Sequence, residues 1–134
     1  MATILAHITV REGAEAEFER IARTLYDGTH RLERGVRRYE YWRGREPRTY
    51  YTLLAFDDFR TFLGHQASPH HESASPELGR LIEDLRLEWL DPVAGASPLP
   101  ETRSQVVADD ADDLTRRQAA AFAIDVADWW LALR

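Results

Sequence analysis

The residues best suited to chemistry in this chain are three histidines that lie close together. His65 ends an aromatic-rich segment with helical spacing, a Ser-Pro pair follows, and His70 and His71 are adjacent. Histidine has an unperturbed pKa of about 6.5, so it exchanges protons near neutral pH. The cluster can therefore supply a general base or a hydrogen-bond donor to a substrate oxygen. The alternative is that these side chains only cap a helix end or tether it to the sheet.

The spacing of the three histidines does not favour a metal site. Helical zinc sites place two histidines at positions i and i+4, a spacing absent here, and only Glu72 offers a nearby carboxylate. Adjacent residues on a helix do not face the same site, so at most one of His70 and His71 is expected to be functional. We therefore predict no metal ligands.

The composition excludes several classes of chemistry. The chain has 134 residues and a formal net charge of −6, all 17 basic residues are Arg, and Cys is absent. It therefore has no Schiff-base lysine, thiol nucleophile or disulfide, and its negative charge disfavours nucleic acid as a main partner. No apolar run reaches the ~20 residues of a membrane span, and the first residues do not resemble a signal peptide. We predict a cytoplasmic protein with one domain plus an appendage.

Hydrophobic periodicity predicts the elements that must position these residues. The expected strands are 3–10, 36–44, 48–56 and 83–91, and the expected helices are 14–33, 57–66 and a short piece from Ser75 to about Ile82. The order β-α-β-β-α-β is the ferredoxin-like α+β plan, a four-stranded antiparallel sheet with helices on one face. Its other face would stay bare, and two such faces packed together would form a dimeric α+β barrel.

The remaining residues divide into a linker and a C-terminal helix. Residues 1–92 form the predicted domain, 93–113 are a linker rich in Pro, Ser and Asp, and 114–134 form an amphipathic helix. The apolar stripe of that helix includes Phe122 and Trp129. A helix of this kind must bury its apolar face, either on its own sheet or on a partner subunit.

Residues 3–92 resemble the antibiotic biosynthesis monooxygenase (ABM) domain. The resemblance lies in the opening strand followed by REGAEAEFERI, in the hairpin segments YEYWRG and TYYTLLAF, and above all in DDFRTFLGHQASPHHE. It implies a homodimeric α+β barrel and a monooxygenase that needs no cofactor. Such enzymes use O2 to oxidise small phenolic, quinol or polyketide-type aromatic substrates, which requires a dry cavity that binds a flat ring and stabilises a phenolate.

The resemblance also implies which residues form the site. His65 matches the family's histidine in the motif, and His71 matches the second when the Ser-Pro pairs are aligned, so these two are the predicted catalytic residues. The predicted substrate-binding residues, which offer aromatic walls or a charge for an oxyanion, are His7, Arg38, Tyr39, Trp42 and Tyr51. Tyrosines on strands also commonly serve only to pack.

Other functions remain open on the same fold. A haem-degrading branch of this fold uses an Asn in the first strand and a Trp in the helix, positions that here hold Ala6 and His65, so haem degradation is disfavoured. A non-catalytic small-molecule-binding or cyclase-like dimeric barrel would need the pocket but would not consume O2. A structural or regulatory protein would instead use the C-terminal helix to dock a partner.

Overall fold

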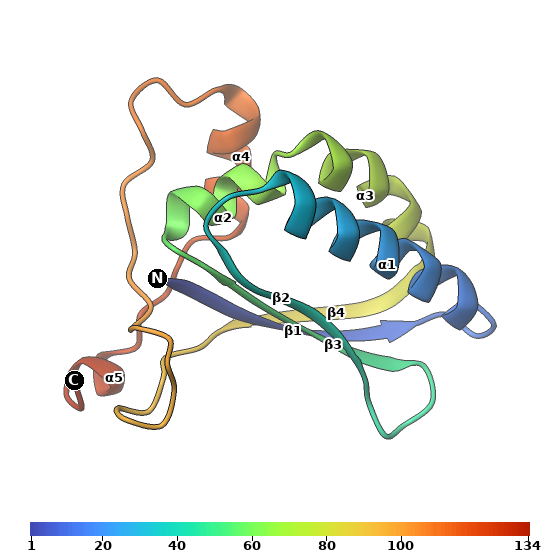
Figure 1. Cartoon of the computed structure of the whole chain (residues 1–134), viewed down its shortest axis with the longest axis horizontal. Coiled ribbons are helices and arrows are strands. Elements are labelled where there is room, and N and C mark those ends of the chain that lie inside the picture. Colours follow the sequence, from blue (N-terminus) through green and yellow to red (C-terminus); the bar gives the residue numbers. More distant parts are fainter.

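The computed structural model describes residues 1–134 and has the predicted ferredoxin-like α+β plan. Its strands are β1 (Ala2–Val10), β2 (Val36–Arg43), β3 (Thr49–Phe56) and β4 (Ile82–Trp89), arranged in the order β2-β3-β1-β4 with every neighbouring pair antiparallel. Three helices, α1 (Glu15–Leu32), α2 (Phe59–Gln66) and α3 (Pro69–Leu81), lie on one face of the sheet (Figure 1). No helix is both long enough and apolar enough to cross a membrane.

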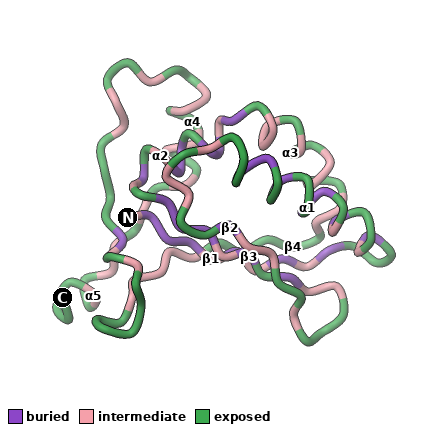
Figure 2. The backbone as a smooth tube through the Cα atoms, in the orientation of Figure 1, coloured by how far each residue is buried: buried purple, intermediate pink, exposed green.

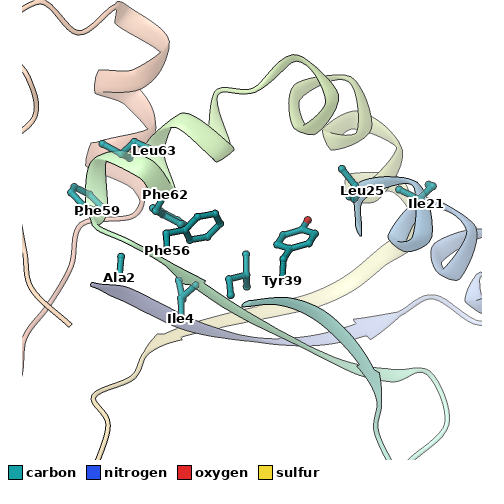
Figure 3. Packing of buried hydrophobic residues seen from close by; sticks show 10 residues of the cluster. Ala2, Ile4, Ile21, Leu25, Tyr39, Phe56, Phe59, Phe62 and Leu63 are labelled. Carbon is teal, nitrogen blue, oxygen red and sulfur yellow. The ribbon is translucent and has the colours of Figure 1, made fainter. Parts of the chain in front are cut away.

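The core lies between the sheet and this helical layer. Strand β1 alternates as expected, because Ile4, Ala6 and Ile8 are buried beneath the helices while the residues between them are half-exposed. Phe18 and Leu25 of α1 cover them, and the buried stretches follow β1, α1 and α2 (Figure 2). The largest cluster of the core brings the aromatic side chains of α2 onto the end of β3 (Figure 3).

Helix α3 begins earlier than the sequence prediction placed it. The Ser68 hydroxyl accepts a hydrogen bond from the His71 backbone N–H at 3.4 Å, and Pro69 occupies the first turn. The predicted start at Ser75 is wrong, and Pro76 lies inside the helix. The Ser-Pro pair at 68–69 supplies the same cap seven residues sooner. Packing of α3 along α1 then keeps the chain helical through Pro76, at the cost of one backbone hydrogen bond.

The predicted continuous helix over 114–134 is also wrong. The structure has two short helices, α4 (Asp113–Ala121) and α5 (Asp128–Leu131). Helix α4 ends at Phe122, whose ring packs on Phe62 of α2 with centroids 5.7 Å apart, and the Trp89 indole donates a hydrogen bond to the Ala123 carbonyl at 3.0 Å. These contacts turn the chain away from the helical path. In the single chain, this segment therefore packs on α2 and β4.

Candidate functional site

The seven predicted site residues fall on opposite sides of the sheet. On the bare face, strand pairing places His7 opposite Tyr51 and Tyr51 opposite Trp42, and the His7 and Tyr51 rings meet edge to face at 5.3 Å. Arg38 is on the same face, with its guanidinium 3.7 Å from the Glu40 carboxylate. His65, His71 and Tyr39 are on the helix-covered side. The structure therefore does not bring these seven residues into one site.

On the helix-covered side, His65 is the centre of a buried polar cluster. Its side chain is 1% exposed, and its Nδ1 lies 2.9 and 3.1 Å from the two carboxylate oxygens of Glu33. His70 Nε2 lies 2.8 Å from the same carboxylate. The Tyr39 ring packs on the His65 ring at a centroid distance of 4.9 Å, and Tyr39 projects from the sheet into the helical layer (Figure 3).

His71 completes this cluster as a neutral side chain. Its ring packs on His65 at a centroid distance of 4.9 Å, and its Nδ1 is buried without a hydrogen-bond partner. Burial, together with repulsion from His65, lowers the pKa of His71 to about 4. His70 and His71 both lie beside His65, although at most one of them is predicted to be functional. His65 is at the end of α2 and both residues are in the first turn of α3, so the two rings approach His65 from different sides.

A separate cavity opens between α1 and the edge strand β2. It has a volume of about 600 Å³, within the usual range for a small-molecule site. Its apolar walls come from α1, β2 and β3, and its apolar lining residues are Phe18, Ala22, Tyr26, Tyr41, Trp42 and Tyr50. Of the seven predicted site residues, only Trp42 lines this cavity.

The polar groups of the cavity have defined protonation states at neutral pH. Arg43 donates two hydrogen bonds of 2.7 Å to the Glu19 carboxylate, and the Tyr50 hydroxyl donates a third at 3.0 Å. Arg43 above all holds the pKa of Glu19 down at about 2. Burial raises the pKa values of Tyr50 and Tyr41 to about 12. The cavity thus presents a fixed ion pair and two protonated phenols.

Tyr39 links the cavity wall to the histidine cluster. The Tyr41 and Tyr39 hydroxyls are 3.0 Å apart, and the Tyr39 ring packs on His65. The Thr29 hydroxyl lies 3.3 Å from His70 Nε2, which in turn contacts Glu33. Polar and aromatic contacts therefore extend from the cavity wall into the protein interior.

Comparisons with known proteins place the chain in a family. The family model described as antibiotic biosynthesis monooxygenase matches residues 1–77, more than half of the sequence. The chain belongs to the ABM family. A search of curated proteins finds no match.

Solved structures of other proteins share the ABM fold. The Pseudomonas aeruginosa protein PA3566 is 24% identical with a TM-score of 0.64, covering 69% of this chain and 94% of its own. A provisionally named antibiotic biosynthesis monooxygenase from Bacteroides thetaiotaomicron is 19% identical with a TM-score of 0.66, covering 78% and 95%. Rv0793 from Mycobacterium tuberculosis is 20% identical with a TM-score of 0.64, covering 72% and 98%. At sequence identities of 24% or less, the similarity to these structures shows the shared fold alone.

Sequence reasoning missed two parts of the candidate site. Glu33 follows the last turn of α1 and lies 32 residues before His65, and no motif there marks it as a partner of the histidines. The Glu19–Arg43 pair joins α1 to β2 across 24 residues. An acidic residue on a helix and an Arg on an edge strand are both ordinary surface features. Only the packing of α1 against the sheet brings them together.

Proposed function

We propose that this ABM-family chain is a cofactor-independent monooxygenase of small phenolic, quinol or polyketide-type aromatic substrates. The observation that carries the proposal is the cavity of about 600 Å³, whose aromatic walls suit a flat ring and whose Tyr41 hydroxyl connects to a buried histidine cluster. Because aromatic rings stack or meet edge to face, Phe18, Tyr26 and Tyr50 would hold the substrate ring. Family membership supports the same reaction class.

In this proposal Tyr41 contacts the substrate oxygen, and the histidine cluster supports Tyr41 through Tyr39. The Tyr41 hydroxyl accepts a hydrogen bond from Tyr39 and donates one to the phenolate oxygen that forms as the substrate loses its proton to water. The Tyr39 ring in turn packs on His65. His65 is 1% exposed and lies outside the cavity, so it is a positioning residue that holds Glu33 in place.

The oxidation itself needs only the substrate and O2. An electron-rich phenolate can pass an electron to O2, and recombination of the two radicals forms the new carbon–oxygen bond. For an anthrone, one oxygen atom enters the ring carbon to give the quinone and the other leaves as water. The protein binds the ring, stabilises the phenolate charge and limits the access of water.

The bare face of the sheet would pack against a second copy. Leu5, Leu53, Tyr51 and Trp42 share that face, and Trp42 and Tyr51 are 58% and 39% exposed. Exposed apolar side chains grouped on one face of a sheet favour an interaction site there. In the proposed homodimer His7 and Arg38 serve the interface and not the cavity. Residues 1–92 form the functional domain of this cytoplasmic protein, joined by the linker 93–113 to the C-terminal segment 114–134.

Oxygen uptake tests the proposed reaction. Metal-free protein is mixed with a panel of anthrones and hydroquinones, and O2 consumption is followed together with quinone formation. We expect O2 uptake above the uncatalysed rate, with quinone as the product. Absence of uptake with aromatic compounds that bind the cavity would contradict the oxygenase proposal.

A non-catalytic small-molecule-binding or cyclase-like barrel is the second candidate. It is favoured by the arrangement of the histidines, because His65, His70 and His71 do not line the cavity. Such a protein would bind flat aromatic compounds with the same affinity in the presence and absence of O2. It would not consume O2.

If the bare face forms the homodimer interface, two matched Tyr→Glu variants should differ in their mass in solution. Tyr51→Glu places a charge in the proposed interface, whereas Tyr26→Glu places one on α1 at a similarly exposed tyrosine, 43% against 39%. Light scattering should give twice the 15.5 kDa chain mass for the wild type and for Tyr26→Glu, and a single chain mass for Tyr51→Glu. A dimer that persists in Tyr51→Glu would exclude this interface, since a buried unpaired carboxylate is too costly to retain.

A further inference from the structure

Three potential metal ligands converge where α1, α2 and α3 meet. Glu33 caps the C-terminal end of α1, His65 is in the last turn of α2, and His70 is in the first turn of α3. A carboxylate oxygen of Glu33, an imidazole nitrogen of His65 and one of His70 all lie within 4.8 Å of one another. The geometry points to a binding site for a divalent transition-metal ion such as Zn²⁺. This inference goes beyond the proposed oxygenase and does not depend on it.

The donor set is one that such ions prefer. Two imidazole nitrogens and one carboxylate oxygen suit Zn²⁺ and neighbouring first-row ions, and a water molecule would complete a tetrahedral site. Ligand atoms bound to one zinc ion at tetrahedral angles lie roughly 3.3 Å apart. The Glu33 oxygen is 2.9 Å from His65 Nδ1 and 2.8 Å from His70 Nε2. Opening these two distances by roughly half an ångström would admit the ion.

The charge and burial of Glu33 favour a cation at this position. The Glu33 side chain is only 12% exposed, and its ion-pair partners are the two histidines, with no Arg among them. A largely buried carboxylate is stabilised by positive charge, which a divalent ion would supply. His70 is 20% exposed, so the site has a route from solvent for the ion. The Thr29 and Ser68 hydroxyls, 3.3 and 3.4 Å from His70 Nε2, can hydrogen-bond a metal-bound water.

The hydrogen bond between His65 and Glu33 can be exchanged for metal bonds. To donate to Glu33, His65 must carry its proton on Nδ1. The other nitrogen of His65, Nε2, is buried and has no partner, so no contact other than Glu33 fixes the proton on Nδ1. Metal binding would replace this proton, and its affinity should therefore rise with pH.

Metal titration of the full chain tests the site. Protein treated with a chelator is titrated with Zn²⁺ by calorimetry and with Co²⁺ by visible absorption. We expect one ion per chain and a rise in melting temperature that the chelator reverses. Glu33→Gln and His70→Gln each remove a ligand but keep a polar side chain, and each should weaken binding at least 10-fold. If Glu33→Gln does not fold, as judged by circular dichroism, His70→Gln decides the question, because His70 is partly exposed.

Two histidine variants elsewhere serve as controls. His30→Gln changes an exposed residue on α1, and His7→Gln changes the second His–carboxylate pair, where His7 Nε2 lies 3.0 Å from Glu88. Both should bind the ion as the wild type does. The proposal is overturned if the wild type binds no ion stoichiometrically or if His7→Gln abolishes binding. It is also overturned if Glu33→Gln and His70→Gln, both folded, bind like the wild type, and the cluster would then be held by hydrogen bonds alone.

Discussion

Replacing Tyr41 with Phe should lower kcat for O2 uptake by about 100-fold and leave KM within about twofold of the wild type. The hydroxyl lost in this variant is the one that joins the cavity to Tyr39, at 3.0 Å, and through it to the histidine cluster. The Phe ring keeps the aromatic wall, so substrate binding should persist. The effect on kcat would come from the lost stabilisation of the phenolate. Steady-state O2 consumption with the best substrate of the anthrone and hydroquinone panel measures both constants.

A matched variant separates this role from a general effect on the cavity. Tyr26→Phe removes a hydroxyl from the same cavity, but at a residue whose ring stacks on His30 and which takes no part in the Tyr41–Tyr39 hydrogen bond. Its kcat should stay near the wild-type value. Equal kcat values for Tyr41→Phe and Tyr26→Phe would show that the Tyr41 hydroxyl does not stabilise the phenolate. If neither the wild type nor any variant consumes O2, the oxygenase proposal itself fails, which is a different outcome.

Periodicity was sufficient to predict the sheet and its two faces. Alternation in β1 correctly assigned Ile4, Ala6 and Ile8 to the buried side and His7 to the other. The prediction was correct because β1 is a central strand with a helical layer on one side only. The alternation of apolar and polar residues therefore follows directly from which side of the sheet is covered. The ferredoxin-like order followed from the strands and helices alone.

The same alternation shows why the predicted site was split. Tyr39 and Tyr41 are two residues apart on β2, so both side chains face the helices. Arg38 and Trp42 occupy the alternate positions of the strand, so their side chains face the bare side of the sheet. Tyr39 and Trp42 therefore point to opposite faces of the sheet, and of these two only Trp42 lines the cavity beside the edge strand β2. The pairing of Tyr39 with Tyr41 could have been inferred from the sequence.

The histidine cluster depends on tertiary packing that no local pattern encodes. The DDFRTFLGHQASPHHE segment drew attention to His65, His70 and His71, and all three rings do lie together. Their common partner Glu33 comes from the end of another helix. Helix α3 begins at the Ser68-Pro69 pair, seven residues before the predicted start, and it packs along α1. Local signals therefore indicated the right region but not its partners.

The depressed pKa of His71 predicts a specific dependence of stability on pH. In the folded protein this pKa is about 4, because the ring is buried beside His65, whereas in the unfolded chain it is near 6.5. Between these values the unfolded chain binds a proton that the folded chain does not. The free energy of unfolding should therefore fall as the pH is lowered from 7 to 4, with His71 contributing about 3 kcal/mol of the loss. Above pH 7 its contribution is constant.

His71→Gln isolates this contribution from that of other groups. The Gln side chain is polar and close to the imidazole in length, but it does not titrate. Urea unfolding at a series of pH values should show a shallower loss for His71→Gln than for the wild type between pH 6.5 and 4. His30→Gln, at an exposed histidine on α1, should follow the wild-type curve. Parallel curves for His71→Gln and the wild type would show that His71 is free to ionise in the folded protein, because only a proton bound equally by both states leaves no slope.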